Sequence, residues 1–182
     1  MKRLFAAFFA ALAFAALPAQ EPKTAERIRA RLGSKVREAQ IHCEPDGKTL
    51  CLLYYAQNSY QALCLDRAAV QKVKAAFSKY EKDFGARRLK RSSPASTVRA
   101  YGHAACLLRW GSKKDDLSRF SSAKIRMGYI FEGASPYFCL AVPSAQSQDE
   151  SKSPALQSSE SVRLLLTRSA VKSLLDLSAG MT

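Results

Sequence analysis

Cysteine and histidine are the residues of this sequence with the most specific chemistry. Cysteines pair as disulfides, whereas cysteines and histidines together hold zinc or build a nucleophile. The spacing favours neither a zinc site nor a nucleophile, because the sequence has no Cys-x-x-Cys pair and His42 and Cys43 are adjacent on an expected strand, where neighbouring side chains diverge. We therefore expect no metal site and no Cys–His nucleophile. The residues considered are His42, His103, Cys43, Cys51, Cys64, Cys106 and Cys139.

One pair of cysteines is brought together by an expected hairpin. Gln57 and Asn58 form a turn between apolar segments at residues 49–56 and 59–65. In a two-residue hairpin Cys51 then faces Cys64 at a non-hydrogen-bonded position, where cross-strand side chains lie closest. This geometry can just accommodate a disulfide between them, but we favour proximity of two reduced thiols, packed as small apolar side chains, over an actual bond. The odd number of cysteines leaves at least one thiol free or intermolecular.

Serine and lysine occur twice at the spacing Ser-x-x-Lys, as Ser121 with Lys124 and Ser169 with Lys172. On a helix this spacing lets the lysine take the proton of the serine hydroxyl. The Ser-Asp-Asn and Lys-Thr-Gly elements that accompany such a dyad in penicillin-binding enzymes are absent from the sequence. We expect Ser169 to be a first-turn residue of a helix and no residue to be catalytic. A small periplasmic hydrolase that uses Ser169 and Lys172 is the alternative.

The densest charge in the sequence is a short basic segment. Four cations within five residues create a local positive potential that can hold phosphate or carboxylate groups, and a solvated linker is the alternative. The whole chain has 29 Lys and Arg residues against 15 Asp and Glu residues, a net charge of +14. Because the acids are few and scattered, paired carboxylates for glycoside hydrolysis are not expected. The candidate binding residues are Arg87, Arg88, Lys90 and Arg91.

Residues 1–19 have the features of a secretory signal peptide. Lys2 and Arg3 precede an apolar run, and Pro18 and Ala19 then supply a helix breaker and a small residue. We expect cleavage after Ala19 and a soluble periplasmic or secreted chain, with an uncleaved anchor as the alternative. Such a compartment favours disulfides and argues against nucleic acid as a partner. An envelope protein or an anionic envelope component is the expected partner, with peripheral membrane contact, while the oligomeric state stays open.

Hydrophobic alternation and turn signals divide residues 20–182 into two β-rich halves of a single domain, at 35–85 and 97–179. Asp66 and Thr167 are the expected caps of a helix at the end of each half. A short helix is expected at 24–33, and the polar segment at 143–160 is expected to be a mobile loop. The expected strands are 36–44, 49–56, 59–65, 97–110, 122–132, 135–142 and 162–166.

The expected fold class is α+β, with a mostly antiparallel sheet from the two halves and a helix of each half packed on one face. Residues 63–70 resemble residues 164–171 at five of eight positions, which is consistent with internal duplication or with the shared needs of a strand–cap–helix junction. The segment at 49–56 is apolar on both faces of a strand. Its second face must meet another layer, a partner chain or an apolar ligand.

These patterns together predict an exported, non-catalytic protein that binds or assembles with an envelope component. A sheet face and the basic segment would form its binding surface, and no cofactor is implied. Besides the hydrolase, the alternative is a carrier of an apolar ligand, which would need a closed apolar cavity inside the fold.

Overall fold

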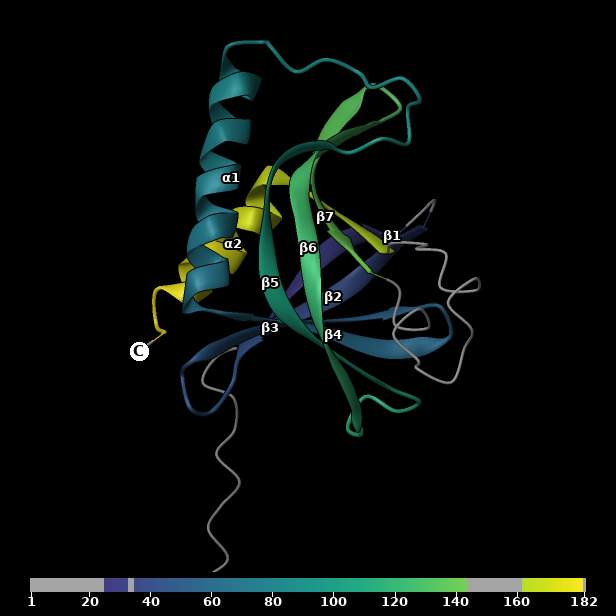
Figure 1. The fold of residues 1–182 in the computed structure, drawn as a ribbon, viewed down its shortest axis with the longest axis vertical. Coiled ribbons are helices and arrows are strands. Elements are labelled where there is room, and N and C mark those ends of the chain that lie inside the picture. Colours follow the sequence, from purple (N-terminus) through teal and green to yellow (C-terminus); the bar gives the residue numbers. More distant parts are fainter. Residues whose placement is uncertain (1–24, 33–34, 144–161, 182) are drawn as a thin grey trace, which may run out of the picture.

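The computed structural model describes residues 25–32, 35–143 and 162–181 (Figure 1). The expected signal peptide at 1–19 lies outside these residues, as does the expected loop beyond residue 143. Within the described ranges, no helix has both the length and the apolar character needed to cross a membrane.

The described chain is a meander of antiparallel strands that closes on itself. Each strand pairs with the next one in sequence, and β1 also pairs with β8, so the sheet forms a closed barrel. The strands are β1 (Ala25–Leu32), β2 (Lys35–Cys43), β3 (Thr49–Ala56), β4 (Ser59–Asp66), β5 (Arg99–Gly111), β6 (Arg119–Glu132), β7 (Ser135–Val142) and β8 (Val162–Leu166). The helices are α1 (Arg67–Gly85), between β4 and β5, and α2 (Arg168–Ser178), after β8.

The closed barrel shows that the expected α+β fold, in which two β-rich halves each end in a helix packed on the sheet, is wrong. The physical reason lies in the first strand, β1. The segment expected as a helix at 24–33 is a strand, in which arginines alternate with apolar residues at the period of two that strands require. Ala30 pairs with Leu166 and Leu32 with Leu164, which joins the first strand to the last. Closure removes the free edges that an open sheet would expose.

Both helices begin where the sequence predicts. The Asp66 carboxylate accepts a hydrogen bond from the Ala69 backbone N–H at 2.7 Å, and the Thr167 hydroxyl accepts one from Ala170 at 3.2 Å. Each cap therefore satisfies one of the N–H groups that a helix start leaves without a partner. The helices do not lie on an open sheet, however, because their buried faces belong to the same apolar cluster as the barrel interior.

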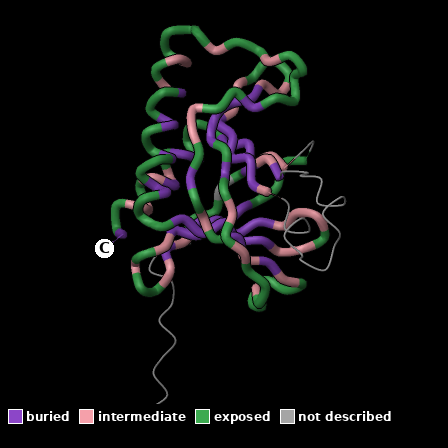
Figure 2. Tube along the Cα trace, in the orientation of Figure 1, coloured by how far each residue is buried: buried purple, intermediate pink, exposed green. Residues whose placement is uncertain are grey.

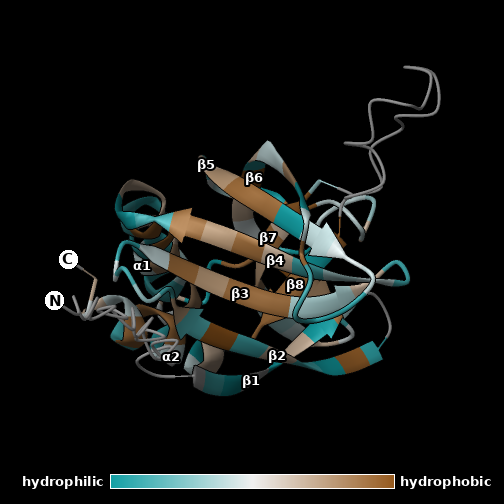
Figure 3. Cartoon of the chain, turned by 90° about the horizontal axis from the view of Figure 1, so that it is seen from below, coloured by the Kyte–Doolittle hydropathy of each residue, from teal (hydrophilic) through white to brown (hydrophobic). Residues whose placement is uncertain are grey.

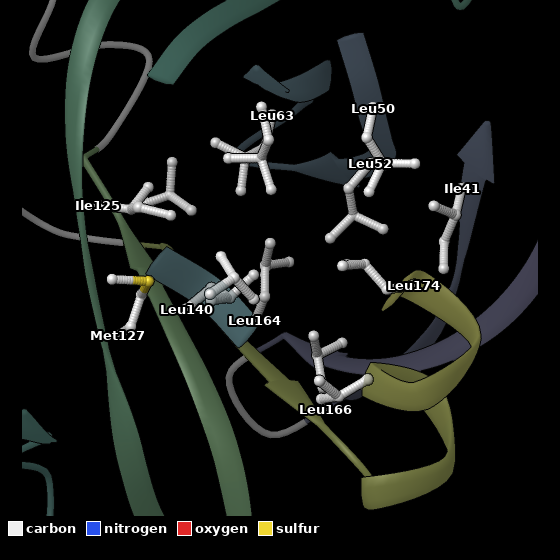
Figure 4. Close-up of a cluster of buried hydrophobic side chains, with 14 of the residues drawn as sticks. Ile41, Leu50, Leu52, Leu63, Ile125, Met127, Leu140, Leu164, Leu166 and Leu174 are labelled. Atoms are coloured by element: carbon white, nitrogen blue, oxygen red, sulfur yellow. The ribbon is translucent and has the colours of Figure 1, made fainter. Parts of the chain in front are cut away.

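Side chains fill the interior of the barrel. Most buried residues of the strands belong to one cluster with the buried faces of α1 and α2, and two smaller buried clusters are separate from it. Figure 2 shows where along the chain the buried residues fall. An eight-stranded barrel is just wide enough for its inward side chains to fill it, and Leu174 of α2 reaches the same cluster (Figure 4). This filling argues against a carrier with an apolar cavity. The labelled interior residues are Ile41, Leu50, Leu52, Leu63, Ile125, Met127, Leu140, Leu164 and Leu166.

Candidate functional site

Three neighbouring strands carry a row of reactive side chains on the outside of the barrel. His42 of β2 lies opposite Cys51 of β3, and Cys51 lies opposite Cys64 of β4. The residues on either side of Cys51, Leu50 and Leu52, belong to the interior cluster. Because side chains alternate along a strand, the row of His42, Cys51 and Cys64 faces outward.

The β3–β4 turn fixes the register of the two thiols. Gln57 and Asn58 both have positive φ, at 51° and 58°, as a two-residue type I′ hairpin requires. The predicted pairing of Cys51 opposite Cys64 is therefore confirmed. Both residues are free thiols here, as are all cysteines of the described chain, and a disulfide between them stays an alternative.

Glu44 adds a carboxylate to this row. It follows the end of β2, and its backbone N–H donates to the Thr49 carbonyl at 2.8 Å. The Cys51 thiol donates to Glu44 Oε1 at 3.3 Å, and Arg109 Nη1 donates to the same oxygen at 3.4 Å. Ligand atoms of His42, Glu44 and Cys51 all lie within 4.8 Å of one another. The three side chains thus form a compact imidazole–carboxylate–thiol cluster.

The cluster opens into a small surface pocket of about 180 Å³. Lys114, Asp115 and Leu117, from the β5–β6 connection, form one side of it. Leu117 packs against the outward apolar residues of β3 and β4, and β3 is hydrophobic along most of its length (Figure 3). The second apolar face of this strand, which the sequence left without a partner, is therefore partly covered by a loop of the same chain.

The surroundings shift the pKa values of the cluster in different directions. Burial lowers the pKa of His42, Glu44 opposes this, and Lys114 and Arg109 reinforce it. Interaction with the facing Cys51 thiol lowers the pKa of the Cys64 thiol, and the Arg109 charge adds to the effect. Interaction with Cys64 and burial raise the pKa of Cys51.

A second row, on the outer faces of β5 to β8, is basic. His103 lies opposite Arg126, Arg126 opposite Ala141, and Ala141 opposite Arg163. The short side chain of Ala141 leaves a gap between the two guanidinium groups. Lys124, two residues before Arg126, lies on the same face of β6 and adds another cation.

This row lines a surface pocket of about 440 Å³, which we call the basic groove. None of its lining residues is acidic. Within the described ranges, none of the lysine and arginine side chains of the groove forms an ion pair. Among the described residues, no ion pair neutralises these charges, and they attract anions. The lining residues are Ser96, Thr97, Val98, His103, Lys124, Arg126, Ala141, Pro143 and Arg163.

The predicted basic segment runs from the end of α1 toward this groove. All four of its cations are exposed, but its backbone is held in place. The Lys90 N–H donates to the Tyr129 hydroxyl at 3.2 Å, and the Arg91 guanidinium lies 5.6 Å from the centre of the Phe131 ring. Ser96, Thr97 and Val98, farther along the same connection, line the groove. The cations are Arg87, Arg88, Lys90 and Arg91.

Ser169 lies in the first turn of α2, as predicted. Its hydroxyl is 3.0 Å from the hydroxyl of Thr167, the residue that caps the helix. Ser169 and Lys172 are both exposed. In the part of the chain that the structure describes, no hydrogen bond joins these two side chains, so the geometry lends the Ser–Lys hydrolase no support.

Spacing along one strand reveals neither the imidazole–carboxylate–thiol cluster nor the basic groove. His42 and Cys43 do diverge, and Cys43 donates to the Leu177 carbonyl on the inner side. The thiol near His42 comes instead from the adjacent strand, as Cys51, and the carboxylate comes from the turn, as Glu44. The sequence signal for this site is the turn at residues 44–48. Once the length of this turn is known, it follows that His42 lies opposite Cys51.

Comparison with known proteins adds a family but no activity. No curated protein matches the chain, and no solved structure matches it. A family model does match over residues 17–179, and it is described as "Uncharacterised Treponema protein". Because this match covers most of the sequence, the chain belongs to that family.

Proposed function

We propose that this chain is an exported, non-catalytic binding protein that docks on phosphate groups of an anionic envelope surface. The observation that carries the proposal is the basic groove, where Arg126 and Arg163 flank Ala141 and none of the described residues that line the pocket is acidic. The exposed basic segment, Arg87 to Arg91, adds cations on the same connection that supplies residues 96–98 to the groove. Export itself rests on the N-terminal sequence pattern.

The chemistry of the groove suits phosphate groups. A guanidinium group presents its N–H donors in a planar fork that matches two phosphate oxygens. The small side chain between Arg126 and Arg163 lets an anion approach both forks. Removal of residues 1–19 takes away Lys2 and Arg3, so a net charge of +12 remains, and it adds a long-range attraction that speeds encounter with a negative surface.

Vesicle sedimentation tests the proposal directly. Chain lacking residues 1–19 is mixed at low ionic strength with vesicles of anionic phospholipid, and with vesicles of zwitterionic phospholipid alone. Retention on the anionic vesicles only, falling as salt is added, is the expected result, because salt screens exposed charges. Equal retention on both vesicles, or none on either, would contradict it.

The basic segment has its own variant. Reversing the charges of Arg87, Arg88, Lys90 and Arg91 to glutamate replaces attraction by repulsion at an exposed site, so retention on anionic vesicles should fall. The hydrolase alternative is checked with an activity-based serine probe. Labelling that is lost in Ser169→Ala would favour the hydrolase over a non-catalytic binding protein.

A further inference from the structure

The imidazole–carboxylate–thiol cluster lies on the outer faces of β2 and β3, and the basic groove does not use it. We propose that His42, Glu44 and Cys51 form a binding site for a divalent transition metal ion of the zinc type. The inference is independent of the proposed binding to an anionic surface.

The distances are close to those that a bound ion needs. Zinc lies about 2.3 Å from a thiolate sulfur and about 2.0–2.2 Å from imidazole nitrogen or carboxylate oxygen, so tetrahedral ligand atoms are separated by roughly 3.3–3.8 Å. The Cys51 sulfur and Glu44 Oε1 are already 3.3 Å apart. All three ligand atoms lie within 4.8 Å of one another, so side-chain rotations alone can bring them around one ion.

The fold holds two of the ligands rigidly and orients the third. His42 and Cys51 are directly opposite each other on paired strands. Glu44 is fixed by its backbone bond to Thr49 and by Arg109, which donates to its carboxylate. The pocket beside the cluster gives an ion a path from solvent and leaves a fourth coordination position facing outward.

The ligand types select the class of ion. Magnesium and calcium take oxygen ligands, whereas a mixed set of nitrogen, oxygen and sulfur suits zinc and its neighbours in the transition series. On binding, the sulfur–metal bond replaces the S–H bond of Cys51, and the thiol proton passes to solvent. No electron is transferred in this step. A Cys51–Cys64 disulfide would consume the same thiol, so the site exists only in the reduced chain.

Cobalt(II) replaces zinc in such sites and reports its ligands by absorption. The untagged chain lacking residues 1–19, reduced with a phosphine, is titrated with cobalt(II) and then with zinc(II). We expect one cobalt ion per chain, a near-ultraviolet charge-transfer band from the thiolate, and displacement by zinc. Failure of the reduced chain to bind one equivalent of either ion would overturn the proposal.

Variants identify the ligands. His42→Ala and Glu44→Gln should each weaken cobalt binding at least tenfold, and Cys51→Ser should abolish the charge-transfer band. Cys64→Ser should keep that band, since Cys64 is not among the three ligands. A band that survives in Cys51→Ser, or binding that is unchanged in His42→Ala, would overturn the assignment.

Controls separate ligand loss from unfolding. Cys106→Ser removes a thiol that donates to the Ala123 carbonyl, away from the cluster, and Gln40→Ala changes the residue two positions before His42 on the same strand. Both should bind cobalt as the unchanged chain does. His42 is only half-buried, so His42→Ala should fold, and its melting temperature without metal checks this. Equal weakening in a control and in His42→Ala would count against the site.

Discussion

Removal of the two guanidinium groups of the basic groove should weaken binding to an anionic surface by an amount that the structure allows us to estimate. In Arg126→Ala with Arg163→Ala, the groove keeps its strands but loses the cations on either side of Ala141. Each cation near an anionic lipid surface contributes about 1 kcal/mol. Loss of both should cost about 2 kcal/mol, or roughly 30-fold in apparent affinity, since about 1.4 kcal/mol corresponds to tenfold.

The assay is vesicle sedimentation over a range of lipid concentrations at low and at moderate salt. A matched control is Lys72→Ala with Lys79→Ala, which removes the same charge from exposed positions of α1. Within the described residues the groove arginines form no ion pair, so the melting temperature of the groove variant should stay close to that of the unchanged chain. At about 0.1 M salt the screening length is about 10 Å, and the difference between the two variants should shrink.

The α1 control variant distinguishes binding at the basic groove from a general effect of net charge. The groove variant should lose much more affinity than the α1 variant. Equal losses in the two variants would show that net charge alone drives binding, and the groove would then have no special role. An unchanged affinity in the groove variant would refute the reasoning outright.

Three further predictions concern stability. Leu164→Ala, in the filled interior at 0% exposure, should cost about 3 kcal/mol, measured by denaturant unfolding. Gly128→Ala should cost about 2 kcal/mol by thermal melting, because its Cβ would lie 2.1 Å from the backbone oxygen of Arg99. The hydrogen bond and charge of Arg168 lower the pKa of Glu81, so this pair stabilises the folded chain above the usual Glu pKa and the contribution is lost as pH falls through the lowered value. The stability difference between the unchanged chain and Glu81→Gln should therefore shrink on acidification in melts from pH 6 to pH 3, and a constant difference would contradict this.

Local signals in the sequence were sufficient for most strands and both helices. β7 and β8 have the predicted bounds, whereas the register shift of β5 between Ala100 and Gly102 was not predicted from its sequence bounds. These features depend on alternation, caps and turn residues, which act over a few positions. The first strand was missed because a threonine followed by charged and apolar residues also resembles a capped helix. Pairing of β1 with β8 makes this segment a strand.

The closed barrel depends on contacts that no local pattern contains. Pairing of Ala30 with Leu166 joins segments more than a hundred residues apart in the sequence. The same limitation applies to the sites. The opposition of Cys51 and Cys64 follows from a two-residue turn, whereas the row through Arg126, Ala141 and Arg163 needs the register of three strands.

Amide NMR of the isotope-labelled chain, lacking residues 1–19, tests the central claim most directly. The chain is titrated with a short-chain anionic phospholipid kept below the concentration at which it forms micelles. The largest shifts should lie at Arg126, Ala141 and Arg163 and at residues 96–98, which line the basic groove. The largest shifts at interior residues such as Leu140, or on the exposed side of α1, would contradict it.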